Sequence, residues 1–124
     1  MNSLLKFSDR IFVAGHRGMA GNAILRRLRS LGYGSKEGGS LLMASRDDLD
    51  LTVSEAVVNW ISNNKPTVVV LAAAKVGGIH ANATYPADFL LDNLKIQTNV
   101  IEAAWKNGVR RLCFLGSSCI YPKF

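Results

Sequence analysis

The sequence lacks several features that would place it outside the ordinary class of small globular proteins. It has two cysteines among 124 residues, and because they form no C-x-x-C or Cys/His pattern, they predict neither a disulfide framework nor a metal site. It has no run of about 18 apolar residues, which excludes a transmembrane helix. Its amino terminus lacks the apolar segment with basic flanks of a secretory signal. We therefore expect one soluble, reduced, cytoplasmic domain that does not engage a membrane.

Acidic residues are also few, which leaves an excess of positive charge. Fifteen lysines and arginines stand against nine acidic residues, giving a formal net charge of +6. This excess permits a polyanionic partner, either a nucleic acid or a phosphorylated small molecule. Only Arg26, Arg27 and Arg29 cluster, and no aromatic residues lie among them. We interpret that cluster as a solvated helix face, and we expect no nucleic-acid partner.

The hydrophobic pattern predicts strands that alternate with helices. The predicted strands cover residues 10–14, 41–44, 67–71 and 112–115. The predicted helices cover residues 19–31, 52–64 and 86–107, the second of them opened by a Thr52/Glu55 capping box. The valine-rich run at 67–71 has no polar alternation, which is typical of a parallel strand covered on both faces. This succession predicts an α/β fold with a doubly wound parallel sheet of the Rossmann type.

Apolar positions predict how these elements pack. In the helix at 19–31 we expect a buried stripe, and in the strand at 112–115 we expect Cys113 to be a core residue. The stripe consists of Ala20, Ile24, Leu28 and Leu31. The helix at 86–107 has two apolar stripes, the first with Leu90, Leu94, Ile101 and Trp105, the second with Phe89, Ile96, Val100 and Ala103. Because covering a sheet needs one stripe, we expect the second stripe to pack on a further part of the protein or on another subunit.

The strongest motif is Gly-His-Arg-Gly-Met-Ala-Gly at residues 15–21, between a predicted strand and a predicted helix. In that context glycines let a dinucleotide pyrophosphate approach the backbone, and the helix amino terminus supplies amides and partial positive charge. The spacing is G-x-x-G-x-x-G rather than G-x-G-x-x-G. The alternative is that these glycines serve only a tight turn and close packing.

The residues after the second predicted strand bear on the choice of cofactor. A site for NAD usually has an acidic residue there to hold the ribose hydroxyls, but here Arg46 follows the strand. Arg46 and Arg17 would instead form charge-assisted hydrogen bonds with a 2′-phosphate, which favours NADP. A shift of one or two residues would place Asp47 or Asp48 at that position and favour NAD, so this alternative stays open.

Three later stretches carry a resemblance to a known family. They include Ala-Ala-Ala-Lys-Val-Gly-Gly at 72–78, residues 82–89, and Gly-Ser-Ser-Cys-Ile-Tyr-Pro at 116–122. Together with the glycine loop they resemble the GDP-L-fucose synthases, which are extended short-chain dehydrogenases/reductases. The resemblance implies an NADPH-dependent enzyme that epimerises C3 and C5 of GDP-4-keto-6-deoxy-D-mannose and then reduces its C4 ketone. It also implies that Ser117 binds the substrate carbonyl oxygen and that Cys119 is the acid/base.

The resemblance and the glycine loop together define the expected cofactor contacts and the expected assembly. The expected cofactor-binding residues are Gly15, His16, Arg17, Gly18, Met19, Ala20, Gly21, Arg46, Asp50, Leu51, Ala73, Ala74, Lys75, Leu115, Gly116, Ser117 and Ser118. The family typically pairs helices between protomers, so we expect a homodimer through the helix at 86–107, with Ile96 and Val100 in the interface.

The chain departs from the family because it contains no Tyr-x-x-x-Lys pair. We therefore expect residues 1–124 to be the amino-terminal, NADP-binding part of a longer enzyme, inactive alone. Two alternatives remain. The first is another nucleotide-sugar epimerase or dehydratase of the same superfamily, and the second is a dinucleotide-sensing domain without catalysis.

Overall fold

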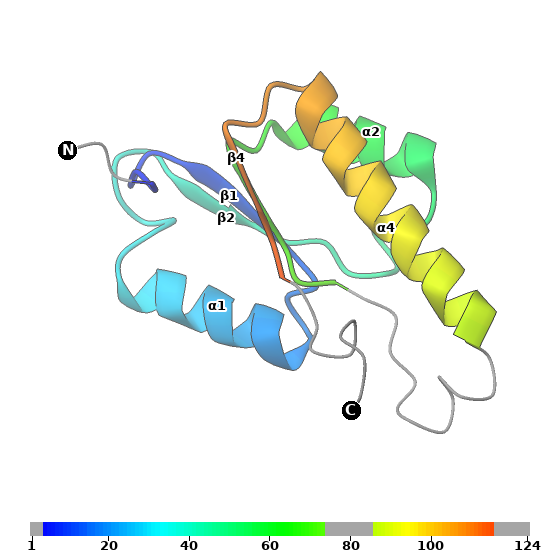
Figure 1. Ribbon diagram of the computed structural model, residues 1–124. Coiled ribbons are helices and arrows are strands. Elements are labelled where there is room, and N and C mark those ends of the chain that lie inside the picture. Colours follow the sequence, from blue (N-terminus) through cyan, green and yellow to red (C-terminus); the bar gives the residue numbers. More distant parts are fainter. Residues whose placement is uncertain (1–3, 74–85, 116–124) are drawn as a thin grey trace.

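The computed structural model describes residues 4–73 and 86–115, which form a parallel four-stranded sheet flanked by helices (Figure 1). The strands are β1 (Arg10–Ala14), β2 (Ser40–Leu42), β3 (Val68–Leu71) and β4 (Arg111–Phe114), in the spatial order β2-β1-β3-β4. The helices are α1 (Met19–Ser30), α2 (Ser54–Asn64) and α4 (Pro86–Lys106). The predicted α/β class with a parallel sheet is confirmed.

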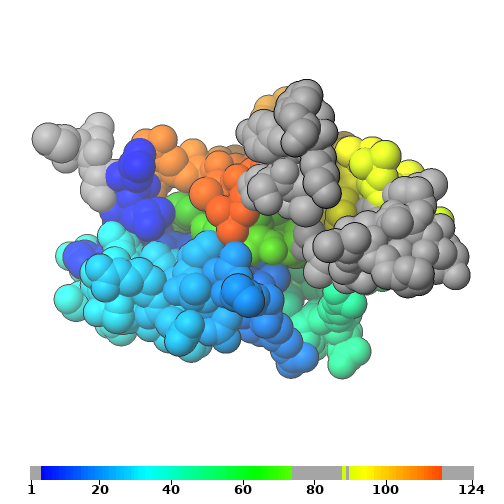
Figure 2. Space-filling view, turned by 60° about the horizontal axis from the view of Figure 1, so that its bottom comes forward, coloured from blue at the N-terminus to red at the C-terminus, as the bar shows by residue number. Residues whose placement is uncertain are grey.

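The sheet is the middle of three layers. Helix α1 covers one face, while α2 and α4 cover the other (Figure 1). In the space-filling view, α1 (light blue) and α4 (yellow) lie on opposite sides of the molecule (Figure 2). The alternation of side chains along β1 explains both contacts, since Ile11 and Val13 pack with α1, whereas Phe12 and Ala14 pack with α2 and α4. Every residue of β3 is buried, as its unbroken apolar run predicts.

The order of the strands locates a candidate site. The chain passes from β1 to β2 on one side, and then crosses back to place β3 on the other side of β1. Open α/β sheets bind ligands outside the carboxyl ends of the strands at such a point of reversal. Here those ends are Ala14 and Leu71, which are register partners.

The opposite edge of the sheet is tied together by a buried carboxylate. Asp9 accepts hydrogen bonds from the backbone N–H of Lys6 at 2.7 Å, from the Thr67 hydroxyl at 2.8 Å and from the guanidinium of Arg110. Burial alone raises the pKa of Asp9, but these hydrogen bonds, that from Arg110 foremost, outweigh burial and hold the pKa below its usual value. The network joins the residues that precede β1, β3 and β4.

Some local predictions are wrong. The buried residues of α1 are Gly21, Leu25 and Leu28, while Ala20 and Leu31 are exposed, because close packing of a glycine moves the buried face. The capping box does not form, since the Thr52 hydroxyl donates to Asp50 Oδ1 at 2.6 Å. The helix instead begins at Ser54, and its N-cap residue, Val53, makes no side-chain capping hydrogen bond.

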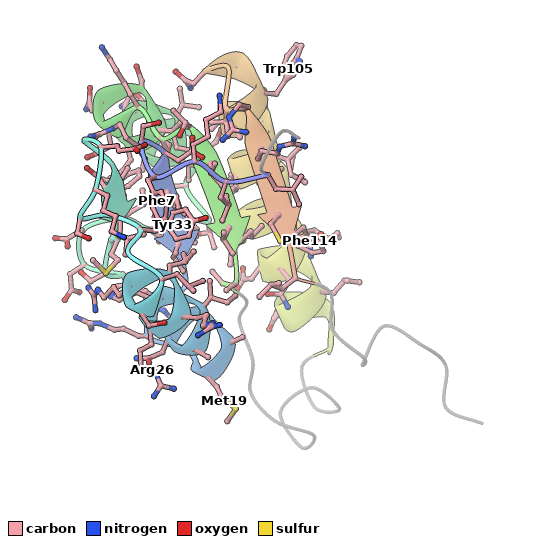
Figure 3. The ribbon with its side chains drawn as sticks, turned by 90° about the vertical axis from the view of Figure 1, so that its left-hand side faces the viewer. Phe7, Met19, Arg26, Tyr33, Trp105 and Phe114 are labelled. Carbon is pink, nitrogen blue, oxygen red and sulfur yellow. The ribbon has the colours of Figure 1, made fainter. Side chains whose placement is uncertain are left out.

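Helix α4 buries the opposite stripe from the one expected. Ile96, Val100 and Ala103 are buried against the sheet, so Ile96 and Val100 are core residues and not interface positions. The other stripe is exposed, and Trp105 (79% exposed) points away from the fold (Figure 3). Cys113 is exposed and not a core residue, because β4 is the last strand of the described sheet and has a neighbour on one side. Among the described residues, no helix is long and apolar enough to cross a membrane.

Candidate functional site

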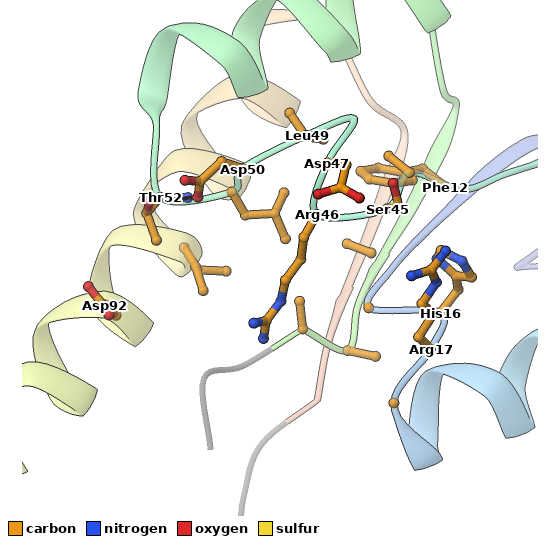
Figure 4. A pocket seen from close by; sticks show the side chains of 18 residues that line it. Phe12, His16, Arg17, Ser45, Arg46, Asp47, Leu49, Asp50, Thr52 and Asp92 are labelled. Carbon is orange, nitrogen blue, oxygen red and sulfur yellow. Dashed lines mark hydrogen bonds between the residues drawn. The ribbon is translucent and has the colours of Figure 1, made fainter. Parts of the chain in front are cut away.

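A cavity of about 680 Å³ opens at the carboxyl ends of β1 and β3 (Figure 4). Three parts of the chain form its walls. The loop after β1 contributes residues 15–18, the loop after β2 contributes most of residues 44–52, and Ala72 and Ala73 follow β3. Asp92 and Ile96 of α4, with Phe12 and Ala14 of β1, complete the lining. The cavity therefore lies where the strand order reverses, as the topology predicts.

Two glycines of the first loop are required by close packing. Gly15 has φ +91°, and a Cβ there would lie 2.6 Å from the backbone nitrogen of Ala73. A Cβ on Gly21 would lie 1.9 Å from the carbonyl oxygen of Gly15. Both contacts are with backbone, which a rotating side chain cannot relieve. The two glycines thus bring the loop close to β3 and to the start of α1.

Gly18 differs from these two glycines. A Cβ on Gly18 would lie 3.5 Å from the Gly15 carbonyl oxygen, an ordinary contact, and Gly18 lines the cavity. It is also the N-cap of α1, where no side chain caps the first turn and no acidic residue lies in it. The amino terminus of α1 therefore has the character of an anion-binding site beside the cavity. Packing accounts for Gly15 and Gly21 but not for Gly18, whose missing side chain leaves room for a ligand.

The loop after β2 is shaped by short-range hydrogen bonds and one buried side chain. The Ser45 hydroxyl donates to Asp48 Oδ2 at 3.0 Å, and the Thr52 backbone N–H donates to Asp50 Oδ1 at 2.9 Å. Leu49 is buried in the core beneath the loop. These contacts direct Arg46 outward, and Figure 4 shows its side chain extending across the space between α4 and the strand ends.

The charged groups of the cavity come from three elements. Arg17 lies on the loop after β1, Arg46 on the loop after β2, and Asp92 on α4 (Figure 4). The carboxylates of Asp47 and Asp50 also line the cavity. Arg17 and Arg46 are exposed, so both guanidinium groups are accessible to an anionic ligand. Among the described residues, no group of His, Cys, Asp or Glu side chains is arranged to hold a metal ion.

The structure brings together part of the expected cofactor set. The expected residues that line the cavity are Gly15, His16, Arg17, Gly18, Arg46, Asp50, Leu51 and Ala73. Met19 and Ala20 are exposed on α1, Gly21 is buried beneath the loop, and the N–H of Leu115 donates to the carbonyl oxygen of Leu71 at 3.2 Å. None of these four lines the cavity. The remaining expected residues lie outside the described part of the chain: Ala74, Lys75, Gly116, Ser117, Ser118 and Cys119.

Several lining residues were not predicted as part of a site. Phe12, Ala14 and Leu49 form the apolar floor, and Ser45 and Thr52 flank Arg46 and Asp50 in the loop. Proximity in sequence to Arg46 and Asp50 could have identified the two loop residues. Asp92 and Ile96 reach the cavity because α4 packs across the face of the sheet, and no local sequence signal identifies them as site residues.

The fold and the glycine loop define the class, a Rossmann-type α/β protein with a site suited to a dinucleotide. The model of the NAD dependent epimerase/dehydratase family matches residues 11–124. The chain belongs to that family.

Within the family, the chain is similar to several proteins of named activity. GDP-L-fucose synthase 1 of Arabidopsis thaliana is 54% identical over 124 residues, which are 100% of this chain and 37% of that protein. GDP-L-fucose synthase of Escherichia coli (strain K12) is 52% identical over 115 residues, 93% of this chain and 34% of that protein. The solved GDP-mannoheptose C4 reductase of Campylobacter jejuni with NADP bound is 36% identical, with a TM-score of 0.85 over 95% of this chain and 36% of its own. The chain thus spans about a third of these relatives.

Proposed function

We propose that this chain is the NADP-binding amino-terminal part of a cytoplasmic, NADPH-dependent epimerase/reductase that converts GDP-4-keto-6-deoxy-D-mannose to GDP-L-fucose. The observation that carries the proposal is the cavity framed by Gly18, Arg17 and Arg46, in a chain that is 54% identical to a GDP-L-fucose synthase. The NADP-bound C4 reductase of the same fold supports the choice of cofactor.

The residues of the cavity fit the groups of NADP. The open backbone at Gly18 and the uncapped amino terminus of α1 suit the pyrophosphate. Arg46 and Arg17 would neutralise the 2′-phosphate, each through charge-assisted hydrogen bonds. Leu51 would lie against the adenine ring, beside Asp50. When bound, the cofactor supplies the hydride that reduces the C4 ketone.

The catalytic residues follow from the resemblance and lie outside the described residues. Ser117 would donate a hydrogen bond to the substrate carbonyl oxygen, and Cys119 would remove and return protons at C3 and C5, which the neighbouring ketone acidifies. β4 runs parallel to β3, so the carboxyl end of β4 at Phe114 lies at the same edge of the sheet as the cavity. In the sequence, Ser117 and Cys119 come three and five residues after Phe114.

Two exposed apolar surfaces support a larger assembly. On β4, Leu112 is 38% and Phe114 is 46% exposed, and we propose that a further part of the enzyme covers them. On α4, the exposed stripe of Leu90, Leu94, Ile101 and Trp105 would pack against the same helix of a second subunit in a homodimer. In the full-length protein, Leu94→Glu with Ile101→Glu should then produce monomers in sedimentation velocity, and persisting dimers would place the interface elsewhere.

Cofactor choice is tested by titration calorimetry of the full-length protein with NADPH and NADH. Arg46→Ala should weaken NADPH binding about ten- to a hundredfold, because a charge-assisted contact is worth about 1.5–3 kcal/mol, and should leave NADH binding nearly unchanged. Arg26→Ala is the matched control, since Arg26 is exposed on α1 and does not line the cavity. Equal affinity of the wild type for the two cofactors would refute the NADP assignment.

The reaction is tested by solvent deuterium exchange at C3 and C5 of the keto sugar. Cys119→Ser should abolish exchange, while reduction of a ketone that is already epimerised should survive. Reduction without exchange in the wild type would favour a second candidate, a reductase that acts at C4 without epimerising the sugar; the Campylobacter structure is named as a C4 reductase. Exchange at the wild-type rate in Cys119→Ser would remove Cys119 from the mechanism.

A further inference from the structure

The loop after β2 forms nearly half of the cavity wall without belonging to a strand or helix. Residues 44–52 contribute eight of the lining residues, although β2 ends at Leu42 and α2 begins only at Ser54. Those eight are Ala44, Ser45, Arg46, Asp47, Leu49, Asp50, Leu51 and Thr52. The shape of the cavity therefore depends on the contacts that hold this loop.

Its turns are closed by local hydrogen bonds. Ser45 bonds to Asp48 and Asp50 to Thr52, partners two or three residues apart. Such bonds shape each turn, but they leave open where the loop lies relative to α4. Leu49 is buried and fastens the middle of the loop to the core.

A side chain of α4 supplies a long-range tie. Nδ2 of Asn99 donates a hydrogen bond of 2.9 Å to the backbone oxygen of Leu51, 48 residues away in the sequence. Asn99 is half-buried between Ile96 and the fully buried Val100, so the core holds its backbone in place. Leu51 and Ile96 both line the cavity, whereas Asn99 does not. The hydrogen bond thus joins the loop at 44–52 to α4, two walls of the cavity, on the side that faces away from the ligand space.

We propose that Asn99 is a positioning residue for the adenosine side of the cofactor site. It holds the Leu51 carbonyl against α4, and so orients Asp50, Leu51 and Thr52 toward the ligand. The adenosine assignment follows because the residues after the second strand of such sheets recognise the adenosine ribose. The inference rests on the proposed NADP function.

Loss of the hydrogen bond between Asn99 and Leu51 changes the conformational equilibrium of the protein without ligand. Without a donor at position 99, the Leu51 carbonyl oxygen hydrogen-bonds to water instead. The loop at 44–52 then occupies the conformation that binds the ligand for a smaller fraction of the time. The apparent dissociation constant rises in inverse proportion to that fraction. We expect a rise of about tenfold, which corresponds to about 1.4 kcal/mol.

The test uses the full-length protein with Asn99→Leu, which removes the donor at similar volume, and Asn99→Asp, which is isosteric and places an acceptor against the carbonyl. Asn107→Leu is the matched control. Asn107 lies just after α4, and its Nδ2 donates at 2.8 Å to the Ala103 carbonyl of that same helix, away from the cavity. NADPH and 2′,5′-ADP are the calorimetric probes, and hydrogen exchange of residues 45–52 is followed without ligand.

Both Asn99 variants should bind NADPH and 2′,5′-ADP about tenfold more weakly, with a raised KM for NADPH and an unchanged kcat at saturation. Exchange in residues 45–52 should rise in these variants only. If Asn107→Leu weakens binding equally, or if the Asn99 variants bind as the wild type does, the inference is overturned. A wild type that binds neither probe would refute the NADP proposal instead, and the exchange measurement would still decide whether Asn99 anchors the loop.

Discussion

The replacement Gly21→Ala tests the packing of the glycine loop most directly. A Cβ at this position would lie 1.9 Å from the Gly15 carbonyl oxygen and 2.7 Å from its carbonyl carbon, whereas real Cβ contacts essentially never fall below 3.0 Å. The start of α1 and the loop must therefore separate by about 1 Å, and the obstacle is backbone. Overpacking of this kind costs about 1–3 kcal/mol or more, and alanine recovers at most about 1 kcal/mol of helix propensity. We expect a net loss of about 2 kcal/mol.

The assay is thermal unfolding of the full-length protein, where that loss lowers Tm by roughly 3 °C if the protein is about three times as long as this chain, like the relatives. Gly18→Ala is the matched control, because its Cβ would lie 3.5 Å from the same oxygen and the residue is exposed. It should change Tm by no more than about 1 °C while weakening NADPH binding, since the new methyl group occupies the space that Gly18 leaves at the cavity. Equal Tm values for the two variants would refute the reasoning that separates a packing glycine from a ligand-facing one.

Two further predictions concern parts of the fold away from the cavity. Arg110→Leu removes the guanidinium that stabilises ionised Asp9, and should lower the free energy of unfolding by about 2 kcal/mol at pH 7. The pKa of Asp9 is lower in the folded protein than in the unfolded chain. The stabilisation is therefore present above the unfolded-state pKa of about 3.9, and is lost as the pH falls through the lower folded-state pKa. In urea titrations the stabilities of the two proteins should therefore converge once the pH falls below the lowered folded-state pKa of Asp9, and a constant difference would contradict the assignment. Lys65 caps α2 with φ +50°, so Lys65→Gly should stabilise the protein by about 0.5–1 kcal/mol in the same assay, whereas Lys65→Ala should not.

Elements with strong local signals were predictable from the sequence. The valine run of β3 has no polar alternation, and it is buried on both faces as expected. The end of α1 was also predictable, since the helix expected at 19–31 is observed at Met19–Ser30. Gly32 follows its last turn, and its N–H donates to the Arg29 carbonyl oxygen at 3.0 Å. The glycine loop between strand and helix indicated the place of the cavity before any contact was known.

The contacts that complete the cavity were not predictable, because they depend on tertiary geometry. Thr52 has two possible partners in the sequence, Glu55 in a capping box and Asp50 in a turn, and the structure selects Asp50. In the sequence, Asn99 is one polar residue of a helical pattern. Only the packing of α4 brings its side chain to the backbone oxygen of Leu51. Asp92 reaches the cavity by the same crossing. Sequence periodicity reports which residues share a face of a helix, but not which element that face meets.

Helix α4 shows the consequence of that ambiguity for assembly. Two apolar stripes of similar strength run along it, and periodicity alone cannot rank them. The structure buries the stripe that contains Ile96, Val100 and Ala103 against the sheet, and Ala104 is buried beside it. In the other stripe, Trp105 and Leu90 are 79% and 61% exposed. A charge at Val100 should therefore unfold the domain, and the homodimer proposed above has to be tested at Leu94 and Ile101, whose replacement leaves the core intact.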